Sequence, residues 1–134
     1  MHLSAGDLLR AERESGSALA TMINEFIRDG KIVPAEITVG LLKKAMFASG
    51  GKKFLIDGFP RNLDNLASWN STMAHVSQTV FMLFLDCPEK VMESRLLKRG
   101  ETSGRNDDNA ESIRKRYYPP SLMCMPELSI NSHY

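Results

Sequence analysis

The sequence predicts an α/β domain in which a parallel sheet lies between two layers of helices. Two short runs, residues 54–56 and residues 80–85, are entirely apolar and do not alternate with polar residues. Such a run is typical of a strand that is covered on both faces, as strands of parallel sheets are. A helical pattern over residues 63–73 separates the two runs, and the order strand, helix, strand predicts a parallel crossover.

Two helices are predicted before the first apolar run, with a clear break between them. Ser4, with Asp7 three residues later, predicts an N-cap and an acidic first turn for a helix that extends toward Glu14. The Ser-Gly-Ser sequence at residues 15–17 ends this helix. A second amphipathic pattern follows, and Gly30 is placed to close it as a C-cap.

Further helices are predicted by their start and stop signals. A third helix lies between Pro34 and the Ser-Gly-Gly sequence at residues 49–51. After the second apolar run, Pro88 occupies a first helical position and Gly100 is placed to close that helix. Asp108 begins a capping box that predicts a final helix.

The composition limits the classes of protein to which the chain can belong. Its 134 residues, 43% of them hydrophobic, suit one globular domain. The formal net charge of +1 gives no overall field that would hold a nucleic acid or a membrane surface. Cys87 and Cys124 lack metal-ligand spacing and indicate a reducing compartment. Because the longest apolar run has six residues, neither a signal peptide nor a membrane span is predicted.

The first apolar run leads into a group of residues that suits a ligand site. These residues are Asp57, Gly58, Phe59, Pro60 and Arg61. In an open α/β sheet, the residues that follow a strand line the crevice in which ligands bind. Gly58 allows a ligand close to the backbone, and Arg61 can direct two donors at a phosphate, although a single surface arginine is usually a solvated charge. The amide of Asn65 suits a base edge, whereas Asn62 is favoured as a helix N-cap.

Four strings resemble the nucleoside monophosphate kinases in order and approximate spacing. They are HLSAGDLLR, GKIVPAEIT, FLIDGFPRNLDN and LLKRGETSGRNDDN. The third is most similar to the UMP/CMP kinase branch of that family, and the resemblance extends from Met1 to about Tyr117. It implies the P-loop NTPase-like fold of these kinases, a three-layer parallel sheet flanked by helices, here without its first and last strands. Residues 1–134 would then form a single partial kinase domain.

The resemblance also implies an activity and an acceptor site. The activity is transfer of the γ-phosphate of ATP to a pyrimidine nucleoside monophosphate, in pyrimidine nucleotide metabolism, with Mg²⁺ as the cofactor of ATP. In the family pattern Arg10 and Arg61 hold the phosphate of the acceptor, Asn65 contacts its base, and residues 4–34 form the monophosphate-binding segment. The other substrate-binding candidates are Ser4, Lys31, Ile32, Val33, Gly58, Phe59 and Pro60.

On the donor side, the resemblance implies a lid over residues 99–109. Arginines in and around this lid would bind nucleotide phosphates and stabilise transition-state charge, with Arg99 on ATP. The catalytic candidates are Arg61, Arg99, Arg105 and Arg116. No direct metal ligand is expected, and Asp57 would reach Mg²⁺ through a water molecule.

Two features depart from the family pattern. The string G-x-x-x-x-G-K-[ST], which cradles donor phosphates, does not occur in the sequence, and residues 117–134 form a divergent tail with two adjacent prolines. We therefore expect a truncated member of the family, and the sequence does not decide whether this chain is active by itself. Two alternatives remain, an adenylate kinase-like enzyme that uses AMP and a catalytically silent nucleotide-binding fragment. The expected partners are ATP, CMP and UMP, without nucleic acid or membrane, and the expected state is a monomer in the cytoplasm or also the nucleus.

Overall fold

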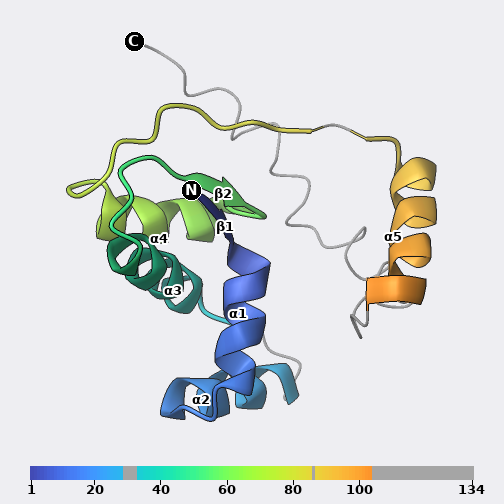
Figure 1. Cartoon of the computed structure of the whole chain (residues 1–134), viewed down its shortest axis with the longest axis horizontal. Coiled ribbons are helices and arrows are strands. Elements are labelled where there is room, and N and C mark those ends of the chain that lie inside the picture. The colour runs from blue at the N-terminus through green and yellow to red at the C-terminus, as the bar shows by residue number, and fades with distance from the viewer. Residues whose placement is uncertain (29–32, 86, 104–134) are drawn as a thin grey trace. The chain divides into compact units, whose positions relative to one another are not determined.

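The computed structural model describes residues 1–28, 33–85 and 87–103. Contacts divide the chain into two units, Met1–Gln78 and Thr79–Tyr134, and each is described by itself. The elements are β1 (His2–Ser4), α1 (Ala5–Glu14), α2 (Ala18–Arg28), α3 (Ala35–Ala48), β2 (Leu55–Asp57), α4 (Leu63–Met73) and α5 (Glu89–Ser103) (Figure 1). All except α5 belong to the first unit.

The sheet of the first unit consists of β1 and β2, which run parallel. Its residue pairs are His2 with Leu55, Leu3 with Ile56 and Ser4 with Asp57. The expected strand at residues 54–56 is confirmed with a shift of one residue, whereas β1 was not expected, because three residues are too few to set a pattern. Since Ser4 lies opposite Asp57 at the ends of parallel strands, whatever follows each strand begins at the same edge.

Helices pack against one face of this sheet. Leu3 is buried in a cluster with Ala5 and Leu42, and Ile56 packs against that cluster. Leu55 points to the opposite face, because successive strand residues alternate, and it is 59% exposed. The expectation that this strand is covered on both faces is therefore wrong for the described residues, which supply a helical layer to one face.

The helix boundaries of the first unit follow local signals. Ser4 Oγ accepts a hydrogen bond from the Asp7 amide at 3.3 Å, which confirms the expected N-cap of α1. Asn62 Oδ1 accepts from the Asn65 amide at 2.8 Å, which confirms Asn62 as the N-cap of α4. Gly16 separates α1 from α2 with a φ of +71°, a conformation that favours glycine.

The second and third helices also agree with the sequence pattern. Helix α3 begins directly after Pro34 and ends before Gly50, which has a φ of +63°. It packs against α1 and α4, and its Val39 and Leu42 are fully buried (Figure 1). Helix α2 begins after the expected break, and its predicted C-cap, Gly30, lies outside the described residues.

In the second unit, the strand expected at residues 80–85 is not formed, so that prediction is wrong. Each of these six apolar residues is between 45% and 79% exposed. A strand exists only when its N–H and C=O groups bond to a neighbouring strand. The described residues of this unit provide no such neighbour.

Helix α5 differs from its expected end. The Pro88 carbonyl accepts bonds from the amides of Val91 and Met92 at 2.9 and 3.0 Å, so the expected start is confirmed to within one residue. The helix continues past Gly100 to Ser103, so the expected stop at Gly100 is wrong. One interior glycine costs a helix only about 1 kcal/mol, which does not end it. The helix expected from Asp108 lies outside the described residues, and none of the described helices has the length and apolar character to cross a membrane.

Candidate functional site

The topology of the sheet brings two segments together at one edge. Helix α1 starts directly after β1, and the loop of residues 58–62 starts directly after β2. Because the strands are parallel and end in register, the first turn of α1 and this loop begin side by side. The carboxyl edge of a parallel sheet is where such folds bind their ligands.

Two guanidinium groups converge at this edge, over Gly6 in the first turn of α1. A Cβ atom placed on Gly6 would lie 3.4 Å from Arg10 Nη1 and 3.7 Å from Arg61 Nη2. Arg10 reaches this point from the next turn of its own helix, and Arg61 reaches it from the loop after β2. Two positive forks directed at one point suit a phosphate group, which offers several oxygens to several donors.

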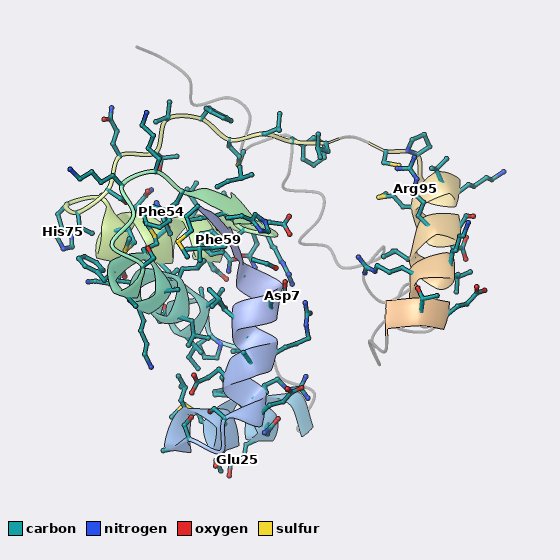
Figure 2. The ribbon with its side chains drawn as sticks, viewed as in Figure 1. Asp7, Glu25, Phe54, Phe59, His75 and Arg95 are labelled. Carbon is teal, nitrogen blue, oxygen red and sulfur yellow. The ribbon has the colours of Figure 1, made fainter. Side chains whose placement is uncertain are left out.

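Arg10 is oriented by a carboxylate on its own helix. Its Nη2 forms an ion pair with Asp7 Oδ1, one turn earlier in α1. The pair is open to solvent, since the side chains of Arg10 and Asp7 are 35% and 60% exposed, so it contributes little to stability. Asp7 lies at the end of α1 that adjoins the strands (Figure 2). Both terminal nitrogens of Arg10 lie close to the Cβ position of Gly6, Nη1 at 3.4 Å and Nη2 at 3.6 Å.

Arg61 is held by its own loop. Its Nε donates to the Gly58 carbonyl at 2.9 Å, and its backbone amide donates to Asn65 Oδ1 at 3.1 Å. Gly58 has a φ of +70°, a backbone conformation that other residues rarely adopt. The loop therefore fixes both the backbone and the side chain of Arg61, and the conformation of Gly58 is part of that arrangement.

The bond from Arg61 also fixes the orientation of the Asn65 amide. A backbone N–H can only donate, so the atom of Asn65 that it meets must be the oxygen. The side-chain nitrogen of Asn65 then faces away from that bond and makes no hydrogen bond with the described residues. Asn65 is half-buried at the start of α4, and its side-chain nitrogen can donate to a ligand.

Phe59 anchors the same loop to the core. Its ring lies 5.6 Å from that of Trp69, centroid to centroid, at an angle of 51°. Phe59 packs against the buried cluster around Leu42 and lies beside the strands in Figure 2. The Phe59–Pro60 peptide bond is cis. The predicted substrate-binding residues Phe59 and Pro60 therefore lie in the loop that carries Arg61, with the Phe59 ring directed at the core.

Ser4 lies at this edge, opposite Asp57 at the end of β1. The remaining predicted site residues lie on other segments of the chain. Val33 is half-buried before α3, and Arg99 is exposed on α5 in the second unit. Lys31, Ile32, Arg105 and Arg116 lie outside the described residues. The predictions for these residues therefore remain predictions.

Asp57 is the residue that was expected to contact Mg²⁺ through a water molecule. It is exposed at the carboxyl end of β2, and its carboxylate makes no bond with a described residue. Among the described residues, no three His, Cys, Asp or Glu side chains gather in a group that could hold a metal ion. A lone exposed carboxylate fits contact with a hydrated Mg²⁺ ion better than a direct binding site, because Mg²⁺ retains most of its water.

Sequence reasoning missed two participants at this edge, Gly6 and Asp7. Asp7 was noted for its place in the first turn of α1, not for its ion pair with Arg10. Gly6 was not singled out at all. The available signal was a glycine inside a predicted helix, where it is unfavourable without a reason of packing or function.

The sequence of the chain is similar to that of known kinases. The family model described as adenylate kinase matches residues 1–126. UMP-CMP kinase 3 of Arabidopsis thaliana is 56% identical over 116 residues, which cover 87% of this chain and 55% of that protein. The UMP-CMP kinase of Gallus gallus is 52% identical over 123 residues, covering 87% and 63%, and that of Homo sapiens is 52% identical over 121 residues, covering 86% and 62%. The chain thus spans between 55% and 63% of the length of these relatives.

Proposed function

The chain belongs to the adenylate kinase family, and we propose that it functions in the transfer of the γ-phosphate of ATP to CMP or UMP. The observation that supports this most directly is the convergence of Arg10 and Arg61 over Gly6, at the carboxyl edge of β1 and β2. The names of its relatives, UMP-CMP kinases, support the choice of acceptor.

The phosphate of the acceptor binds between the two arginines. Arg10 donates from Nη1, and Arg61 donates from Nη2, while Arg61 Nε stays bonded to the Gly58 carbonyl. Phosphoryl transfer requires little covalent chemistry from the protein, so holding the attacking oxygen in position is a large part of catalysis. Arginine suits this role because it stays protonated and its fork has a fixed geometry.

The base of the acceptor is read by Asn65. With its oxygen bonded to the Arg61 amide, Asn65 offers N–H groups to an acceptor atom of the base. Cytosine and uracil share a carbonyl oxygen at position 2, and a donor directed at that atom accepts both. Adenine has no carbonyl group. Because the ring nitrogens of adenine also accept hydrogen bonds, the preference for pyrimidine monophosphates over AMP is supported by the names of the relatives and not by this donor alone.

The donor nucleotide is bound by Arg99, with Arg105 and Arg116 as further donors to its phosphates. When Mg²⁺ is bound with ATP, it neutralises charge on the phosphates that react. Asp57 would hold a water molecule of that ion, in keeping with its exposed position at the end of β2. The role of this chain's residues is to bind the phosphates and to keep the attacking oxygen in line.

Isothermal titration of the chain with CMP, UMP, AMP and cytidine tests this proposal. We expect CMP and UMP to bind more tightly than AMP, and cytidine to bind weakly because it lacks the phosphate. Arg61→Ala should weaken CMP binding by about 1.5 to 3 kcal/mol, the range for hydrogen bonds to charged groups.

Arg13→Ala provides the matched control. Arg13 is also an exposed arginine of α1, but it bonds to Asn24 of α2 and takes no part in the pair over Gly6. Its replacement removes the same charge and should leave CMP binding unchanged. Equal loss in both variants would mean that net charge, not the paired arginines, holds the ligand, and tighter binding of AMP than of CMP would contradict the acceptor assignment.

A further inference from the structure

Gly6 lies at a helical position where the backbone conformation does not require glycine. It lies inside α1, and the glycines with positive φ in the described residues are Gly16, Gly50 and Gly58. The backbone of Gly6 is therefore open to alanine. Glycine is also among the least favourable residues for a helix, and alanine is the most favourable. The helix alone would gain from a side chain at this position.

Packing against another part of the backbone does not explain Gly6 either. The three heavy atoms nearest to an added Cβ all belong to arginine side chains: Arg10 Nη1 at 3.4 Å, Arg10 Nη2 at 3.6 Å and Arg61 Nη2 at 3.7 Å. These are ordinary contact distances, so alanine would fit without displacing the helix. Gly40, inside α3, differs in this respect, because nothing lies within 4 Å of its Cβ position.

We propose that Gly6 is a positioning residue for the acceptor phosphate: because it has no side chain, the space between the Arg10 and Arg61 guanidinium groups stays open to the anion. A methyl group there would contact nitrogens of both arginines and would cover donors that the phosphate must reach. The methyl group would lie against both terminal nitrogens of Arg10, at 3.4 and 3.6 Å, so a small turn of the guanidinium group would not uncover a donor. This inference rests on the proposed acceptor site. It adds to that site a residue that acts by leaving room for the phosphate.

The test compares Gly6→Ala with Gly40→Ala in the whole chain. The two variants make the same chemical change inside helices of the same unit. Thermal unfolding should show that neither variant is less stable than the parent, since alanine favours a helix. NMR titration with CMP and with cytidine then measures binding with and without the phosphate.

We expect Gly6→Ala to weaken CMP binding by about tenfold, the effect of losing one hydrogen bond to a charged group. Binding of cytidine should stay unchanged, and Gly40→Ala should bind both ligands like the parent. Gly6→Ser, which extends further between the arginines, should weaken CMP binding more than Gly6→Ala does. This graded loss, confined to the phosphate-bearing ligand, is not what a purely structural role would produce.

The outcomes separate this inference from the proposed function. If the parent binds CMP and Gly6→Ala binds it within twofold of the parent, the inference is overturned and the proposed function stands. If Gly6→Ala weakens CMP and cytidine equally, the role of Gly6 is not tied to the phosphate, and the inference is again overturned. If the parent itself binds CMP no better than cytidine, the proposed acceptor site fails, and the inference fails with it.

Discussion

At the scale of single residues, the candidate site depends on residues that hold other residues in place. Gly58 supplies the carbonyl that accepts from Arg61 Nε, and it does so with a φ of +70°. Asn65 accepts from the Arg61 amide and thereby connects the arginine that we propose binds phosphate to the side chain that we propose meets the base. Changes at these two positions should therefore affect binding in different ways.

Gly58→Ala should weaken both stability and CMP binding. The left-handed conformation costs a residue with a Cβ about 1 to 2 kcal/mol, and the added Cβ would lie 3.5 Å from Arg61 Nη2. We expect a loss of that size in urea unfolding, together with weaker CMP binding by titration. Unchanged CMP affinity in a destabilised variant would show that the loop conformation does not govern the position of Arg61.

Asn65→Asp tests the donor role of Asn65. The substitution keeps an oxygen for the Arg61 amide but removes the N–H donors that we assign to the base. CMP binding should weaken by about 1 to 3 kcal/mol, because an acceptor of the base is left unpaired. Ribose 5-phosphate is the control ligand: a general effect of the added charge on the phosphate would weaken both ligands equally and would contradict the assignment.

At the scale of the elements, local signals set the helices, and α1 and α4 each begin with a side-chain cap. Ser4 both ends β1 and caps α1, so the first turn of α1 starts at the edge where Asp57 ends β2. Capping is local in the sequence, so the sequence predicted both caps. The predicted helix end at Gly100 is wrong, since α5 continues to Ser103. A glycine permits a helix to end but does not require it.

Ser4→Ala should destabilise the first unit by about 1 kcal/mol through loss of the α1 N-cap. Ser71→Ala is the matched control, because Ser71 lies exposed within α4 and caps no helix. Urea unfolding followed by circular dichroism measures both variants. An equal effect of the two substitutions would show that the 3.3 Å bond from the Asp7 amide contributes nothing measurable.

At the scale of the whole molecule, the sequence predicted what neighbours along the chain determine and missed what distant segments determine. The strand at Leu55–Asp57 and the helix at Leu63–Met73 follow from short patterns. The strand expected at residues 80–85 has the right composition, but a strand also needs a partner, which composition does not supply. Likewise, the meeting of Arg10 and Arg61 over Gly6 depends on the register of β1 with β2, and no local pattern reveals it.

The division into two units predicts where proteases cut. Residues 80–85 lie at the start of the second unit, one residue after its first, Thr79. They carry bulky apolar side chains and are largely exposed outside helices and strands. Brief chymotrypsin digestion should therefore accumulate a fragment that contains Met1–Gln78, identified by mass spectrometry, and CMP should increase the persistence of that fragment. Cleavage within α1, α3 or α4 at the same rate would contradict the division.

The contact between Phe59 and Trp69 gives the protein a built-in optical signal. Trp69 is the one tryptophan in the sequence, and its ring lies 5.6 Å from that of Phe59, two residues before Arg61. Indole emission is sensitive to its immediate surroundings, so the intrinsic fluorescence of the unlabelled chain monitors the loop that carries Arg61. The conformation of that loop can thus be followed in real time by rapid mixing, without a dye or a tag.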